Sequence, residues 1–321
     1  MKLATIRDGS VDGRLVVVSG DLARAVPAEG ARTMQEALER WTEIEESLLA
    51  QSAEVNVGAS AAFDPTTAMA PLPRAWQWLD GSVFQSHGDL MDAVFGMDKK
   101  ERTPFPLMYQ GVSDRFYGPG DEVRMPNEDD GLDFEGEFGI ITDRVPMGSD
   151  AVTCAGHIRL IVQINDWSLR KLAPVEMKTG FGWIRAKPPC SMAPVAVTPD
   201  ELGAAWRDNR VDLPLNVSWN GEKFGAASGY PMAFGFDELV SHAAYSRDLV
   251  AGTVIGSGTV SNESFREVGS SCIAERRGIE TIDLGEARTP YMSFGDRVRM
   301  EVFGRDGQSV FGAIDQKVVS A

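Results

Sequence analysis

Near the middle of the chain the sequence reads Leu132-Asp133-Phe134-Glu135-Gly136-Glu137-Phe138-Gly139-Ile140-Ile141. Large apolar residues alternate with acidic ones, and a period of two is typical of a β-strand with one apolar and one polar face. Glu135 and Glu137 then lie side by side on the polar face, about 7 Å apart. Carboxylates this close repel each other unless a cation lies between them, and Mg²⁺ and Ca²⁺ prefer oxygen ligands. From this stretch alone, an acidic strand face exposed to solvent is the alternative interpretation.

The composition limits the kinds of partner that the protein can have. The chain has 321 residues, which is enough for one large domain and a small one. Its formal net charge is −16, with 31 Lys and Arg residues against 47 Asp and Glu residues. Because such a charge repels nucleic acids and anionic membranes, neither is an expected partner. The sequence has no run of about 18 apolar residues, so no membrane-spanning helix is predicted.

The cysteines and the N-terminus indicate the compartment. Cys154, Cys190 and Cys272 are odd in number and lack Cys-x-x-Cys spacing. This pattern favours reduced thiols over a disulfide framework or a zinc site. The first nine residues indicate a strand and a turn, and they lack the apolar segment of a signal peptide. We therefore expect a cytoplasmic protein.

The first part of the chain is predicted to form a small domain. Short strands are expected at 2–7, 14–18 and 22–26, with Asp12-Gly13 as a hairpin turn between the first two. Thr33 and Glu36 form a capping box, which begins a helix that is expected to end near residue 51. Residues 57–74 are rich in Ala, Pro and Gly and are typical of a linker. We predict a small, β-rich accessory domain at 1–72 and a main domain at 73–321.

The main domain is predicted to be mostly antiparallel β-structure. We expect a short helix at 88–95, an apolar strand at 158–165, a helix start at 198–201 and a longer helix at 236–249. Strands at 211–219 and 222–226 are joined by Asn220-Gly221, a strong hairpin signal, and short strands are expected from 253 to 319. Strands and helices do not alternate regularly, which disfavours a doubly wound sheet or a TIM barrel. The predicted fold class is α+β, mostly β.

Several motifs together resemble one enzyme family. The sequence has neither a glycine-rich phosphate loop nor a Gly-x-Ser-x-Gly nucleophile elbow. Four stretches in order resemble the fumarylacetoacetate hydrolase family, and they are Phe134-Glu135-Gly136-Glu137, Asn165-Asp166-Trp167-Ser168-Leu169-Arg170, Lys187 with Met192-Ala193-Pro194-Val195, and Gly256-Ser257-Gly258-Thr259-Val260-Ser261. Tyr109-Gln110-Gly111 and residues 309–316 are similar to bacterial fumarylacetoacetase-type members. The resemblance runs from about residue 74 to the C-terminus. It implies a mixed β-roll or sandwich catalytic domain after a small β-rich domain, usually in a homodimer.

The resemblance also implies roles for individual residues. The implied metal ligands, for Mg²⁺ or alternatively Ca²⁺ or Mn²⁺, are Asp80, Glu135, Glu137 and Asp166. The implied catalytic residues are His87 as a base that deprotonates water, Glu275 as its orienting acid, and Lys187 as a cation for the substrate. The implied substrate-binding residues are Tyr109, Arg170 and Thr259. Without the resemblance, Asp80 is better interpreted as a turn acid and Asp166 as a cap after its strand. Glu280 is a competitor for the role of Glu275. We expect His157 and His242 to be structural.

One departure from the family pattern concerns the substrate contacts. Eukaryotic members carry a Gln and a Tyr soon after the Arg, whereas residues 171–178 contain neither. Bacterial members are similar to this chain in that respect, and the eukaryotic substrate contacts are not carried over to this segment.

The resemblance implies metal-dependent hydrolysis of a carbon–carbon bond in a diketo acid. The leading expectation is conversion of fumarylacetoacetate to fumarate and acetoacetate, a step in tyrosine and phenylalanine catabolism. The alternatives on the same scaffold are acylpyruvate hydrolysis and the decarboxylation, isomerisation or dehydration of related oxo acids. A third interpretation is a dicarboxylate-binding protein that has no activity.

Overall fold

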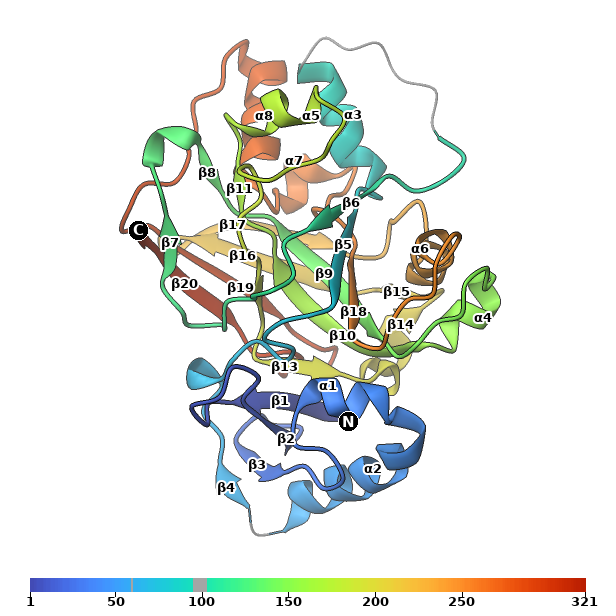
Figure 1. Ribbon diagram of the computed structural model, residues 1–321. Coiled ribbons are helices and arrows are strands. Elements are labelled where there is room, and N and C mark those ends of the chain that lie inside the picture. The colour runs from blue at the N-terminus through green and yellow to red at the C-terminus, as the bar shows by residue number, and fades with distance from the viewer. Residues whose placement is uncertain (59, 95–102) are drawn as a thin grey trace.

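The fold consists of two β-sheets with helices at both ends of the molecule (Figure 1). The computed structural model describes residues 1–58, 60–94 and 103–321. The larger sheet has the strand order β4-β3-β2-β1-β13-β10-β9-β18-β5-β6, and β12 also pairs with β10. Its strands are β1 (Lys2–Ile6), β2 (Arg14–Val18), β3 (Arg24–Pro27), β4 (Ala61–Ala62), β5 (Gln77–Gly81), β6 (Met108–Gly111), β9 (Gly136–Thr142), β10 (Ile158–Asn165), β12 (Ser191–Met192), β13 (Val195–Val197) and β18 (Thr253–Gly256).

The second sheet and two short ribbons complete the β-structure. The second sheet has the order β17-β16-β19-β20-β7. Its strands are β7 (Val123–Met125), β16 (Pro214–Trp219), β17 (Glu222–Ser228), β19 (Arg297–Val302) and β20 (Ile314–Ser320). The ribbons pair β8 (Leu132–Asp133) with β11 (Ser168–Leu169), and β14 (Trp206–Arg207) with β15 (Arg210–Val211). Mixed sheets of this kind confirm the predicted α+β class.

The helices gather in separate groups (Figure 1). Those at the end of the molecule opposite the N-terminal strands are α3 (Gln85–Val94), α5 (Ala173–Met177), α7 (Phe265–Val268) and α8 (Ile273–Leu284). The others are α1 (Met34–Glu39), α2 (Trp41–Val57), α4 (Ala151–Ala155) and α6 (Phe236–Ala243), with the 3-10 turns η1 (Pro65–Thr67), η2 (Glu128–Asp130) and η3 (Pro199–Ala205). The described residues contain no helix that is long and apolar enough to cross a membrane.

The acidic stretch is buried on both faces, so the solvent-exposed alternative is wrong. Its strand is split, because β8 ends at Asp133 and β9 begins at Gly136 between β10 and β18. Every residue of β9 is buried. One face of β9 contributes Phe138 to the core that also holds β16 of the second sheet, while the other face contributes Ile141 to a core shared with α1 and α2. A strand covered on both sides leaves no face for solvent.

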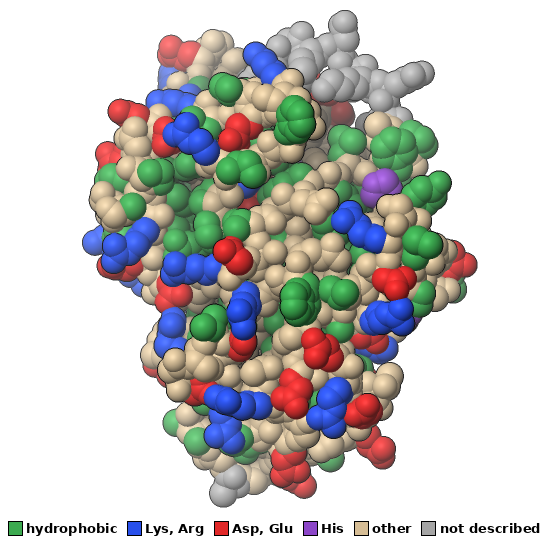
Figure 2. Space-filling model, viewed as in Figure 1, with side chains coloured by type: hydrophobic (Ala, Val, Ile, Leu, Met, Phe, Trp, Pro, Cys, Tyr) green, Lys and Arg blue, Asp and Glu red, His purple; other side chains and the backbone are tan. Residues whose placement is uncertain are grey.

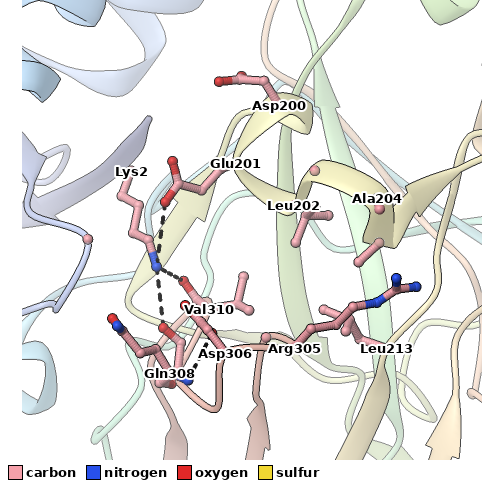
Figure 3. Close-up of a pocket in the computed structure, with 15 residues that line it drawn as sticks. Lys2, Asp200, Glu201, Leu202, Ala204, Leu213, Arg305, Asp306, Gln308 and Val310 are labelled. Atoms are coloured by element: carbon pink, nitrogen blue, oxygen red, sulfur yellow. Dashed lines mark hydrogen bonds and ion pairs between the residues drawn. The ribbon is translucent and has the colours of Figure 1, made fainter.

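The N-terminal segment shares a sheet with the rest of the chain. β1 pairs with β2 and also with β13, in the register Leu3↔Ala196. Beside this junction lies a cavity of about 410 Å³ (Figure 3). There the ammonium group of Lys2 donates to the backbone oxygens of Ser309 and Val310, at 3.3 and 3.0 Å. The predicted boundary near residue 72 stays a prediction, but both sheet and side chains cross it.

Several predicted elements differ from the structure. The expected linker at 57–74 is packed instead, since it contributes β4 to the large sheet and buries Ala70 and Leu72. The helix predicted for 33–51 is divided at Arg40, where ψ is 24°, and it continues to Val57. The strand predicted at 211–219 is interrupted between β15 and β16. The predicted start at 198–201 is a 3-10 turn.

The predictions for helices after residue 236 are wrong in two places. The helix expected at 236–249 ends at Ala243. The region from 253 to 319 was expected to hold only strands, but it contains α7 and α8. The buried face of α8 consists of Ile273, Glu275 and Gly278, so the usual stripe of large apolar residues is missing.

The short helix expected at 88–95 begins earlier, at Gln85, and residue 95 lies outside the described residues.

The excess of acidic residues is not concentrated on the face in Figure 2. Acidic and basic side chains are interspersed there, most visibly over the N-terminal part at the lower end. The acidic residues that matter for the site are buried.

Candidate active site

Three predicted metal ligands meet at the ends of neighbouring strands. Asp80 lies near the end of β5, Glu137 near the start of β9, and Asp166 directly after β10. Their carboxylate oxygens lie within 4.8 Å of one another. β18 runs between β5 and β9, and a Cβ atom on its Gly256 would lie only 2.4 Å from Asp80 Oδ1. The glycine therefore allows the close approach that forms this acidic trio of Asp80, Glu137 and Asp166.

The acidic trio has the electrostatic properties of a cation site. Asp80 is 4% exposed, and Glu137 and Asp166 are 0% exposed. Burial, and then repulsion from the other carboxylates, raises the pKa of Glu137 and of Asp80 well above the usual range. Neither carboxylate oxygen of Glu137 has a hydrogen-bond donor among the described residues. Because a buried carboxylate without a partner is unfavourable, the three residues fit a hard divalent cation.

Glu135, the fourth predicted ligand, has different surroundings. Its Oε1 accepts hydrogen bonds from Ser168 Oγ at 2.5 Å and Lys187 Nζ at 2.6 Å. Its Oε2 accepts from Thr259 Oγ1 and lies 3.2 Å from Arg170 Nη2. Burial opposes ionisation, but the two cations hold the pKa of Glu135 well below its usual range. Glu135 lies outside the acidic trio, so its role as a metal ligand stays a prediction.

Lys187 lies between the acidic trio and Glu135. Its Nζ donates to Asp166 Oδ2 and to Glu135 Oε1, both at 2.6 Å. Tyr109, which lies opposite Asp80 in the β5–β6 pair, also donates to Asp166 Oδ2, at 2.7 Å. An ammonium group has three protons, so one donor of Lys187 remains for a substrate oxygen.

Two residues near Lys187 were not predicted from the sequence. The Trp183 ring meets the Tyr109 ring edge-on, with 4.7 Å between centroids, and its centroid lies 5.8 Å from Lys187 Nζ. The Cys190 thiol donates to Asp166 Oδ1 at 3.0 Å. Burial raises the pKa of the Cys190 thiol well above its usual value, which keeps it neutral beside the carboxylate. Trp183 precedes Lys187 by four residues in a polar and glycine-containing loop, and no pattern there indicates a contact.

His87 and Glu275 face each other from α3 and α8. His87 Nδ1 lies 3.7 Å from Glu275 Oε1, which also accepts a hydrogen bond from Ser261. His87 Nδ1 and Glu275 Oε2 have no hydrogen-bond partner in the described part of the chain. The two side chains are therefore neighbours, but they are not hydrogen-bonded.

Glu280, the competitor for the role of Glu275, and the other two histidines have partners of their own. Glu280 accepts hydrogen bonds from the backbone N–H groups of Arg288 and Thr289, at 2.7 and 2.8 Å. His157 pairs with Asp143 at 2.6 Å, and the ring of His242 stacks on Phe105 with 5.7 Å between centroids. These contacts are what structural residues would make.

The buried acidic trio could hold a metal ion, and two family models give the family to which this fold belongs. Residues 78–319 match the model described as "Fumarylacetoacetate (FAA) hydrolase C-terminal", and residues 1–74 match "Fumarylacetoacetase N-terminal domain 2". The chain belongs to the fumarylacetoacetate hydrolase family. Members of this family are hydrolases or isomerases, which agrees with the enzyme class that the sequence motifs predicted.

Individual relatives are distant. A 2,4-didehydro-3-deoxy-L-rhamnonate hydrolase from Sphingomonas sp. (strain SKA58) is 28% identical over 161 residues, which span 48% of this chain and about half, 52%, of that protein. The structure of maleylpyruvate hydrolase from Sphingobium sp. SYK-6 with manganese(II) and pyruvate has a TM-score of 0.67 at 16% identity, with full coverage of both chains. Fumarylacetoacetate hydrolase from Exiguobacterium antarcticum gives 0.67 at 18%, again with full coverage. At these identities the likeness establishes the fold.

Proposed function

We propose that the protein hydrolyses a carbon–carbon bond in a diketo acid, with fumarylacetoacetate as the leading substrate and fumarate and acetoacetate as products. The observation that carries the proposal is the approach of His87 to Glu275 in a fold that also gathers the acidic trio, since hydrolysis needs a base for water as well as a cation for the carbonyl groups. The side chain of His87 is 15% exposed and that of Glu275 is 0% exposed. Water can therefore reach the His87 imidazole, whereas the Glu275 carboxylate is shielded from solvent.

The proposed mechanism assigns one task to each group. A divalent cation held by Asp80, Glu137 and Asp166, with Glu135 as the further predicted ligand, would supply Lewis-acid polarisation of the substrate carbonyl groups. His87 removes a proton from a water molecule, which then attacks the carbonyl carbon. Glu275 orients the imidazole and stabilises its positive charge after proton transfer.

The cationic and hydroxyl side chains complete the mechanism. As the carbon–carbon bond breaks, the electron pair moves onto the leaving fragment as an enolate, and the third N–H of Lys187 donates to its oxygen. Arg170, Tyr109 and Thr259 are proposed to hold the substrate carboxylate. In the structure Arg170 Nη2 is buried and lies 3.2 Å from Glu135 Oε2, but it has no hydrogen-bond partner among the described residues. This supports a hydrogen bond from Nη2 to a ligand oxygen.

Acylpyruvate hydrolysis is a second candidate. The structural neighbour from Sphingobium is described as a maleylpyruvate hydrolase in complex with pyruvate, and it covers the whole chain. The same cluster and the same base would serve both reactions. The expected cytoplasmic location and homodimer remain predictions.

One experiment separates these functions. The protein is incubated with Mn²⁺ or Mg²⁺ and with fumarylacetoacetate, acylpyruvates or oxaloacetate, while the diketone absorbance and the products are followed. Hydrolysis gives two carboxylic acids, isomerisation gives no fragments, and decarboxylation releases CO₂. Loss of a diketo acid that depends on the metal and on His87 supports the proposal. Metal-dependent isomerisation without cleavage, or cleavage that persists in His87→Asn, would contradict it.

A further inference from the structure

Asp133 is a buried acid that belongs to neither the acidic trio nor the predicted catalytic residues. It ends β8, two residues before Glu135, and it is 0% exposed. Its Oδ1 accepts a hydrogen bond from the backbone N–H of Ile273 at 2.7 Å. Its Oδ2 accepts from the backbone N–H of Ala274 at 2.9 Å and from Arg170 Nε at 2.7 Å. One carboxylate thus connects β8, the start of α8 and the arginine after β11.

The contact with α8 fixes the position of Glu275. The first N–H groups of a helix have no partner within the helix, so they need an acceptor from outside it. Asp133 accepts from the first two, and Cys272 Sγ accepts from the N–H of Glu275 at 3.3 Å. A negative charge at this end of a helix is also favourable. Glu275 directly follows Ala274 in the chain. The hydrogen bonds of Asp133 therefore also fix the backbone from which the Glu275 side chain extends toward His87.

The contact with Arg170 fixes its guanidinium group. Asp133 binds the Nε edge, while Nη2 lies 3.2 Å from Glu135 Oε2 without forming a hydrogen bond. The guanidinium is planar and rigid, so holding Nε in place also sets the direction of the other N–H groups. In Figure 1, β8 and β11 lie next to the end of the molecule where α8, α5 and α3 gather.

We propose that Asp133 is a positioning residue that fixes Arg170 and the start of α8 relative to each other. It thereby aligns Arg170, which is proposed to bind the substrate carboxylate, with Glu275, which faces His87. The role of Asp133 in catalysis rests on the proposed function. Its effect on the start of α8 can be measured by hydrogen exchange without a substrate.

The test is Asp133→Asn, with Asp143→Asn as a matched control. The asparagine amide keeps one acceptor but turns an NH₂ group toward the N–H groups of Ala274 and Arg170. Asp143 is also buried, at 9% exposure, and it pairs with Arg159 at 2.7 Å just after the opposite end of β9. Both variants lose a buried acid–arginine pair, but only the first loses contacts to the site.

Three measurements are compared between the variants. Asp133→Asn is expected to speed hydrogen exchange at residues 273–276 by about tenfold or more, to lower kcat by at least about tenfold, and to raise KM. Mn²⁺ affinity, read by electron paramagnetic resonance, should stay within about twofold. Asp143→Asn should lower thermal stability without any of these changes. Unchanged exchange in Asp133→Asn, or equal kinetic losses in both variants, would overturn the proposal.

A second variant covers the case in which Asp133→Asn does not fold. Arg170→Gln keeps the carboxylate but removes the cation that holds it, so exchange at residues 273–276 should still become faster. Unchanged exchange there would show that α8 is fixed independently and would overturn the proposal. If the wild-type protein cleaves no diketo acid, the proposed function fails, whereas the exchange data still decide the action of Asp133.

Discussion

Glu137 and Glu135 lie two residues apart, yet they are expected to respond in opposite ways to the loss of their charge. Glu137→Gln removes a carboxylate from a cluster of like charges. Glu135→Gln removes a carboxylate that is bound by Lys187 and lies beside Arg170. The first change should stabilise the metal-free protein, whereas the second should destabilise it.

The structure gives the magnitudes. The oxygens of the acidic trio lie within 4.8 Å of one another, where two unit charges repel by about 3.5 kcal/mol at an effective dielectric constant of about 20. The raised pKa of Glu137 already reduces its charge, so we expect a stabilisation of about 1–2 kcal/mol in Glu137→Gln. Breaking a buried ion pair costs about 3 kcal/mol, which is the expected loss in Glu135→Gln. Each kcal/mol corresponds to about 2 °C in Tm for a chain of this size.

Calorimetry after dialysis against EDTA, with and without added Mn²⁺, measures both effects. For the wild-type protein, Mn²⁺ at about 100 times its Kd should add about 2.7 kcal/mol. Glu137→Gln should raise the Tm of the metal-free protein and lose most of the Mn²⁺ effect. If Glu137→Gln instead lowered that Tm and kept the full response to Mn²⁺, the assignment of the acidic trio as a cation site would be refuted.

Three further predictions concern single side chains. His87→Asn should lower kcat by about 10²–10⁴-fold in a kinetic assay while leaving Mn²⁺ binding unchanged. Trp183→Ala removes the ring beside Tyr109 and Lys187, and KM for the diketo acid should rise by about tenfold, measured against Trp183→Phe as the control. Burial, and then Asp150, raises the pKa of the Cys154 thiol to about 11. Because the unfolded thiol ionises first, near pH 9, stability should fall between about pH 9 and 11 in urea titrations, and the fall should be smaller in Cys154→Ser.

Elements with strong local signals were predicted from the sequence. The apolar run that forms β10 leads directly to Asp166, as expected, and the Asn220-Gly221 turn joins β16 to β17. These features depend on neighbouring residues, so local patterns contain them. Helix α8 was missed because its N-cap is Cys272, which is not a usual capping residue, and because it buries Glu275.

The chemistry of the site was only partly predictable. The motifs placed the acidic residues near one another, and the structure gathers Asp80, Glu137 and Asp166. The hydrogen bonds that distinguish Glu135 from Glu137 could not be predicted from the alternation of apolar and acidic residues. Their donors Lys187 and Thr259 lie 52 and 124 residues away in the sequence. The same holds for Asp133, whose partners on α8 are 140 and 141 residues distant. Long-range contacts of this kind leave no periodic trace in the sequence.

The continuous large sheet has a consequence for attempts to shorten the chain. β1 covers β13 by backbone pairing, in the register Lys2↔Val197 to Ala4↔Val195. A version without the first 72 residues would leave the N–H and C=O groups of β13 open on a buried, apolar strand. Unprotected sheet edges recruit other chains. We therefore expect residues 73–321 alone to form aggregates, so the N-terminal segment acts as a cover against misassembly as well as a support for the fold.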